Sequence, residues 1–174
     1  MTSSADASSH YTGLVLAVHP TTRGFGWVLF ENPHTPVAWA VVHARAGREQ
    51  QLLSRFERLL DRYEPAVCVL EAYEDGASRR SPRIQELCRA MVHETALRAI
   101  DTPIFDREAI GAAFASAKAT TRAEIAAVIA ERIKAFSYRL PPKRKLGNSD
   151  DARQCLFDAA ALALTFFTFR GDID

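Results

Sequence analysis

The sequence predicts an α/β fold, with a five-stranded mixed sheet and helices on both of its faces. Two observations support this prediction. Near the start of the chain, short apolar runs are separated by Gly, Asn and Pro, as in consecutive strands. Farther along, apolar residues recur at helical spacing, and two more short apolar runs lie between the helical segments.

The predicted strands are short and apolar, and they cover Leu14–Val18, Gly26–Phe30, Val37–Val42, Ala66–Leu70 and Pro103–Phe105. The connection between the second and third strands is short, so we expect the first three strands to form an antiparallel meander. A helix precedes each of the last two strands, and such crossovers join parallel strands. The sheet is therefore expected to be mixed.

Helices are predicted where apolar residues recur every three to four positions, at Leu52–Tyr63, Pro82–Ile100, Arg107–Ala115, Thr121–Phe136 and in a last helix that ends near Phe169. Ser81 is the expected N-cap of the second helix, because a Pro at the first helical position follows it. Ser149 or Asp150 is expected to cap the last helix.

Length and composition favour a single domain over residues 13–170, because the chain has 174 residues and is 48% hydrophobic. Residues 1–12 are rich in Ser and Ala, and we expect them to be a disordered tail. No apolar run is long enough to span a membrane, which predicts a soluble, cytoplasmic protein. The net charge of +1 argues neither for nor against a polyanionic partner. The three cysteines, Cys68, Cys88 and Cys155, lie far apart and are expected to be buried free thiols.

Candidate site residues lie at two strand ends and on the last helix. We expect His19 and Glu71 just past the carboxyl ends of neighbouring strands, where ligands of largely parallel sheets gather. Asp151 and Asp158 are seven residues apart on the last helix and share one face with Cys155. Clustered carboxylates suit Mg²⁺, and two metal ions can activate water and stabilise the leaving oxygen of a phosphodiester.

Glu71 and Asp158 are the best candidates for metal ligands, although each acidic residue also has a structural interpretation. A Glu at a strand end is more often solvated or salt-bridged than catalytic. Asp151 is better explained as a negative charge near a helix N-terminus. Asp158 lies in an apolar stretch, where a buried carboxylate is costly without a partner, which favours a functional role.

Basic residues flank this acidic centre in the sequence, and the candidates for nucleic-acid binding are Arg79, Arg80, Arg83, Lys118, Arg122, Lys143, Arg144 and Lys145. Such residues usually belong to solvated surface. Around an acidic centre, however, they match a surface that follows a phosphate backbone.

Four segments resemble the RuvC family of Holliday junction resolvases, within the RNase H-like superfamily: Leu16–Gly26, Val69–Glu71, Leu87–Ala90 and Asp158–Leu164. The resemblance runs from about Leu14 to Phe167. It implies an RNase H-like fold and a homodimer that cuts branched DNA with Mg²⁺ or Mn²⁺. It also implies that Glu71 and Asp158 are metal ligands, and that Arg122 stands where the family has a lysine.

Two residues depart from the family pattern: His19 replaces its first acid, and Cys155 replaces the acid one turn before Asp158. Two functions therefore remain open. The first is a divergent endonuclease that uses Glu71, Asp158 and Asp151, with His19 as a further candidate. The second is a degenerate relative that binds structured nucleic acid or a protein without cutting. Sugar kinases and actin-like ATPases need two such domains, for which 174 residues are too few.

Overall fold

The computed structural model describes residues 12–45, 47–74, 80–142 and 152–173. It contains a sheet whose strands lie in the order β3-β2-β1-β4-β5, made of β1 (Val15–Thr21), β2 (Gly24–Asn32), β3 (Thr35–His43), β4 (Val67–Glu71) and β5 (Ile104–Phe105). The first three strands form an antiparallel meander, and β4 and β5 run parallel to β1. The predicted five-stranded mixed sheet is thus confirmed. The predicted tail and the capping residues Ser149 and Asp150 lie outside the described residues, except for Thr12.

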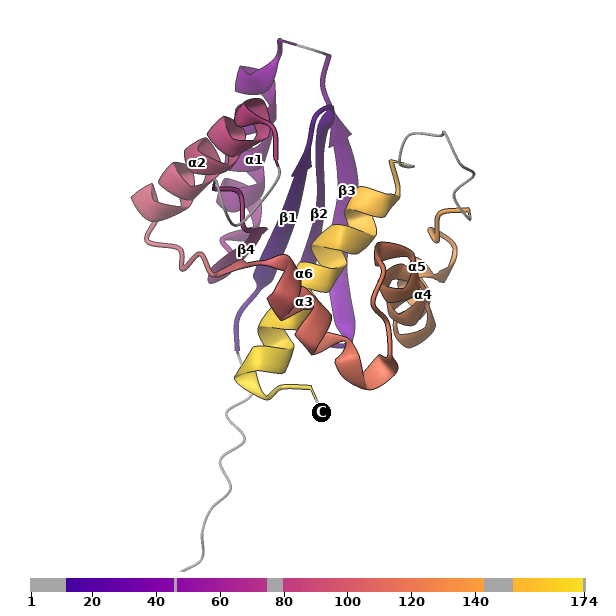
Figure 1. Cartoon of the computed structure of the whole chain (residues 1–174). Helices are drawn as coiled ribbons and strands as arrows, with labels where there is room; N and C mark the ends of the chain where they lie inside the picture. The colour runs from indigo at the N-terminus through magenta and orange to yellow at the C-terminus, as the bar shows by residue number, and fades with distance from the viewer. Residues whose placement is uncertain (1–11, 46, 75–79, 143–151, 174) are drawn as a thin grey trace, which may run out of the picture.

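Helices cover both faces of this sheet (Figure 1). One face carries α1 (Glu49–Tyr63) and α2 (Pro82–Leu97). The other carries α3 (Arg107–Ala113), a 3₁₀ turn (Ala115–Ala117), α4 (Arg122–Arg132), α5 (Lys134–Ser137) and α6 (Gln154–Arg170). Among the described residues, no helix is both long and apolar enough to cross a membrane.

The two cores follow from the alternation of side chains along the strands. In β1, Val15 and Ala17 face the α6 side, whereas Leu16 and Val18 face α1 and α2. Because β1 is covered on both faces, it reads as a continuous apolar run. The helix α6 is buried throughout Cys155–Phe167, so its apolar residues surround it instead of forming one stripe. All three cysteines are buried and free, as expected.

The predicted helix Thr121–Phe136 is wrong as a single element. The structure ends α4 at Arg132, leaves Ile133 in an extended conformation, and begins the short α5 at Lys134. This break buries both Ile133 and Phe136. The Phe136 ring packs edge-on against aromatic rings of β2, β3 and α6, namely Phe30, Trp39 and Phe157. Tertiary packing therefore overrides a helical pattern that contains no breaking residue.

Candidate functional site

The sequence had suggested that His19 lies just past the end of the first strand. In the structure, His19 lies inside β1. The parallel pairing of β1 with β4 stops at Val18 opposite Leu70, whereas its antiparallel pairing with β2 continues to Thr21. His19 and Glu71 are the next residues of β1 and β4 after the last parallel pair. Both are therefore held at the same level of two neighbouring strands, and both are buried.

Asp158 reaches this level because the start of α6 lies directly on β2. Gly26, the β2 partner of His19, has no side chain, and an added Cβ would lie 2.4 Å from the carbonyl oxygen of Cys155. This glycine therefore lets the helix backbone approach the sheet. The close contact of Gly26 with α6 is a feature that only the fold reveals.

His19 lies between the two acidic residues and contacts both. Its Nδ1 is 3.1 Å from Oε2 of Glu71, and its Nε2 is 3.4 Å from Oδ2 of Asp158. An imidazole donates from both nitrogens only in its protonated form. A protonated His19 is thus able to donate to both carboxylates at once.

Two arginines form ion pairs with the carboxylate of Glu71. Arg80 donates from Nη2 to Oε2 of Glu71 at 2.5 Å and from Nη1 to the carbonyl oxygen of Pro20 at 2.9 Å. The same Nη2 lies 3.3 Å from Nδ1 of His19. Arg107, at the start of α3, places its Nε 2.7 Å from Oε1 of Glu71. Both oxygens of this carboxylate therefore face guanidinium nitrogens.

The carboxylate of Asp158 likewise accepts hydrogen bonds from α4 and from its own helix. Arg122, the first residue of α4, donates through Nε to Oδ1 at 3.1 Å and through Nη2 to Oδ2. Gln154, one turn earlier on α6, donates to Oδ1 at 3.1 Å. The arginine therefore holds both carboxylate oxygens, the fork geometry in which guanidinium binds carboxylate best.

The charges of this cluster decide what it is able to bind. Counted over the described residues, three guanidinium groups and two carboxylates leave a net charge of +1 even when His19 is neutral. Burial of Glu71 disfavours its charged form. The hydrogen bond and charge of His19, with the charges of Arg80 and Arg107, outweigh that effect and lower the pKa of Glu71 to about 2. The carboxylate is thus ionised and paired.

Among the described residues, the donor set at Glu71 and Asp158 does not fit a divalent metal ion. All four oxygens of Glu71 and Asp158 already contact nitrogen donors. Cys155 donates to the carbonyl oxygen of Ala152, and burial, aided by the nearby Asp158, raises the pKa of its thiol to about 12. A neutral thiol is not a metal ligand. Within the described ranges, no three His, Cys, Asp or Glu side chains form a group able to hold a metal.

The remaining predicted site residues are dispersed or lie outside the description. Asp151, Arg79, Lys143, Arg144 and Lys145 lie outside the described residues. Arg83 pairs with Glu49 of α1, and Lys118 is exposed before α4. Of the predicted basic residues that the structure describes, Arg80 and Arg122 reach the acidic centre.

Arg107 and Gln154 belong to the site but were not predicted from the sequence. A signal for Arg107 existed: it follows β5 at the carboxyl end, the same kind of position that singled out Glu71. Gln154 lies four residues before Asp158, which places the two side chains on one face of a helix. Neither position points to a carboxylate partner until the elements are packed together.

Neither a protein-family model nor a curated protein matches this chain in sequence. Its fold is similar to that of solved resolvase structures. For Thermus thermophilus RuvC the TM-score is 0.66 at 15% identity, covering 91% of this chain and 96% of that chain. For T. thermophilus RuvC in complex with a Holliday junction substrate it is 0.64, at the same identity and coverage.

A third similar structure is the yeast mitochondrial Holliday junction resolvase Ydc2, with a TM-score of 0.62 at 12% identity, covering 96% of this chain and 82% of that chain. Identities this low show a shared fold and leave the chemistry to be argued from the site. The chain has the RNase H-like, α/β fold of these resolvases.

Proposed function

We propose that this protein binds branched or structured DNA and does not cut it by metal-dependent chemistry. The second half of the proposal rests on one observation. The carboxylates that a metal nuclease of this fold would use already pair with His19, Arg80, Arg107 and Arg122. The first half is supported by the shared fold, because T. thermophilus RuvC has been solved with a Holliday junction substrate.

Loss of cleavage follows from simple electrostatics. Two-metal hydrolysis needs clustered negative charge to hold cations beside the phosphate. Here the cluster carries excess positive charge, and a neutral imidazole binds through one nitrogen and prefers softer ions than Mg²⁺. The same positive charge favours the phosphate backbone of a nucleic acid.

The alternative is an active endonuclease that uses Mg²⁺ or Mn²⁺ with Glu71, Asp158, Asp151 and His19 as catalytic residues. The observation that favours it is the convergence of Glu71 and Asp158 on one point, since each contacts a different nitrogen of His19. This alternative predicts cleavage products in at least one metal. We also propose that the protein is cytoplasmic. We further propose that it acts as a homodimer, as the resemblance implies; light scattering measures this property.

A labelled four-way DNA junction tests the proposal. The purified protein is incubated with the junction in Mg²⁺ and, separately, in Mn²⁺, beside the Glu71→Gln variant. We expect a shifted, uncut junction in both metals. Paired nicks that disappear in Glu71→Gln would instead establish the endonuclease. His19→Asp, which restores an acid at the first position, is the variant in which to look for a gain of cleavage.

A further inference from the structure

We propose that the surface around α5 binds a strand of unpaired DNA. A base stacks on the ring of Tyr138, and the phosphates of the strand lie near Lys134 and Arg139. The inference rests on the proposed binding of structured DNA and adds a class of ligand to it, namely bases that are not part of a duplex. We call residues 131–140 the α5 surface.

Tyr138 is the most exposed large hydrophobic side chain that the structure describes. Its exposed fraction is 91%, compared with 66% for Leu97, which comes next. Every nucleobase has a flat π face, and proteins that hold unpaired strands without sequence preference do so largely by stacking bases on aromatic side chains. The ring of Tyr138 is therefore accessible to a base that has left its duplex.

The backbone that carries this exposed ring is anchored in the core. Phe136, two residues earlier, is fully buried and packs edge-on against Trp39 of β3, with the ring centroids 5.0 Å apart. The amide of Arg139 donates to the carbonyl oxygen of Phe136 at 2.9 Å. An aromatic side chain on an ordered backbone has few rotatable bonds left to fix, so little conformational entropy is lost when a ligand binds.

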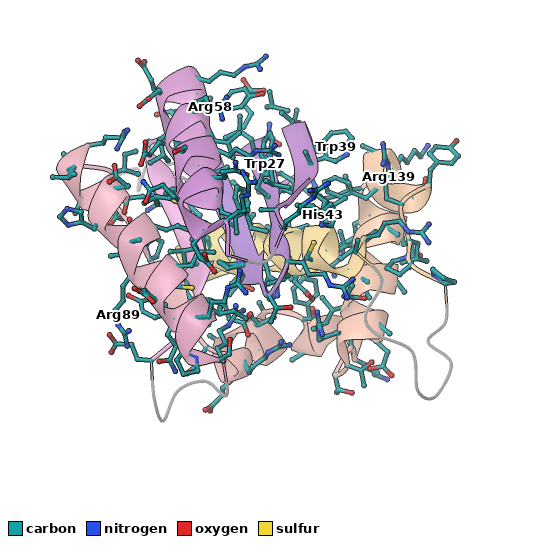
Figure 2. The ribbon with its side chains drawn as sticks, turned by 90° about the horizontal axis from the view of Figure 1, so that it is seen from above. Trp27, Trp39, His43, Arg58, Arg89 and Arg139 are labelled. Carbon is teal, nitrogen blue, oxygen red and sulfur yellow. The ribbon has the colours of Figure 1, made fainter. Side chains whose placement is uncertain are left out.

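Positive charge surrounds Tyr138. The α5 surface contains three cations, Arg132, Lys134 and Arg139, and one acid, Glu131, so its net charge is +2, whereas the whole chain carries +1. All four of these side chains are exposed. The neighbouring strand β3 contains no acidic residue, and Figure 2 shows Arg139 on the side of the molecule where Trp39 of β3 lies. This charge is complementary to a phosphate backbone.

The ring and the cations are expected to respond to different features of the DNA. Cations bind the phosphates of a duplex and of a single strand alike. A ring stacks only on a base whose face is accessible, and inside a duplex each base is covered by its neighbours. Loss of the Tyr138 ring should therefore weaken the binding of an unpaired strand and leave the binding of a fully paired junction almost unchanged.

Fluorescence anisotropy with two labelled probes, an oligothymidine strand and a fully paired four-way junction, measures this difference. We expect Tyr138→Ala to raise the Kd for the strand about tenfold and to change the Kd for the junction by less than about twofold. Tyr138→Phe keeps the ring and should bind both probes like the wild type. Lys134→Ala and Arg139→Ala should each raise the Kd for the strand about threefold and reduce the slope of log Kd against log salt by about 0.7.

Matched controls remove an exposed aromatic ring or an exposed cation elsewhere. Phe169 is 59% exposed near the C-terminal end of α6. Arg58 is exposed on α1, which covers the other face of the sheet (Figure 2). Phe169→Ala and Arg58→Ala are expected to change the Kd for the strand by less than about twofold, because a side chain away from the bound strand contributes little. Thermal melts check that each variant is folded.

Photo-crosslinking gives a direct readout of stacking. An oligothymidine strand that carries one 5-iodouracil is bound to the wild-type protein and irradiated, which links the modified base to an aromatic ring in contact with it. We expect mass spectrometry to locate the link at Tyr138. Links found only at other residues would overturn the inference.

The binding outcomes separate this inference from the proposed function. A wild-type protein that binds the junction but not the strand would overturn the inference and leave the proposed function standing. An equal Kd of the wild type and Tyr138→Ala for the strand would do the same, as would equal losses of affinity for both probes. Binding of the strand without the junction would support the α5 surface and overturn the proposed binding of branched DNA. Binding of neither probe would overturn both.

Discussion

The two buried carboxylates of the site are stabilised by different parts of the chain. Glu71 ends an interior strand of the sheet, and its partners Arg80 and Arg107 come from segments before α2 and at the start of α3. Asp158 lies on α6, and its partners are Arg122 of α4 and Gln154 of the same helix. Within the part of the chain that the structure describes, His19 is the residue that contacts both. The negative charges of the two acids are thus paired with different arginines, and one imidazole contacts both acids.

This difference assigns unequal roles to the arginines. A buried ion pair contributes little net stability, but removal of one partner leaves an uncompensated charge at a large cost. Arg80 is the most buried of the three arginines, whereas Arg122 is one-third exposed. Substitution of Arg80 should therefore lower stability more than substitution of Arg122 does. Four changes to the protein or its conditions test this contrast.

Arg80→Ala is expected to lower the free energy of unfolding by about 4 kcal/mol, because it removes the buried partner of Glu71 and a donor to the carbonyl of Pro20. Urea denaturation measures the change. Arg89→Ala, an exposed arginine on α2, is the control (Figure 2). Equal effects of the two substitutions would refute a structural role for Arg80.

Stability should fall on acidification through Glu71. Its pKa is lowered from 4.5 to about 2, so its contribution, about 3 kcal/mol, is fully present above pH 4.5 and is lost as the pH falls towards 2. The measurement is urea unfolding of the wild type and Glu71→Gln between pH 7 and pH 2.5. Their difference should shrink over that window, whereas Glu131→Gln, an exposed control, should show no such convergence. Parallel profiles for wild type and Glu71→Gln would contradict the prediction.

Gly26→Ala is expected to destabilise the fold by about 2 kcal/mol, because the new Cβ would overlap the backbone at the start of α6. The shift should also move Asp158 relative to His19, which links the sheet to the helix side of the site. Thermal unfolding measures the loss. Gly111→Ala on α3 is the control, since a Cβ there meets nothing within 4 Å. A stability like that of the wild type would show that α6 does not depend on this approach.

Arg122→Ala is expected to cost only about 1 kcal/mol of stability, because the pair with Asp158 is partly exposed and Gln154 and His19 remain. Urea denaturation measures the change, with Arg132→Ala, an exposed arginine at the other end of α4, as the control. A stability loss as large as that of Arg80→Ala would remove the contrast between the two sides.

Much of the fold was predictable because local patterns agree with it. The apolar runs predicted the strands. The spacing of Leu52, Phe56 and Leu60 predicted α1, and the Ser-Pro pair predicted the start of α2. The length of β1 was not predictable, since Pro20 and Thr21 do not resemble a buried strand and are ordered by pairing with β2. The break at Ile133 has the same cause, because packing of Phe136 in the core outweighs helical propensity.

At the site, local strand and helix patterns were enough to identify the groups that are present: the acids Glu71 and Asp158, and a histidine and a cysteine where the family pattern has acids. What the acids do depends on tertiary packing, because their partners come from distant segments. Arg80, Arg107 and Arg122 reach the two carboxylates through the packing of α2, α3 and α4 around the sheet. A charge in a sequence acquires its role from the charges that the fold places beside it.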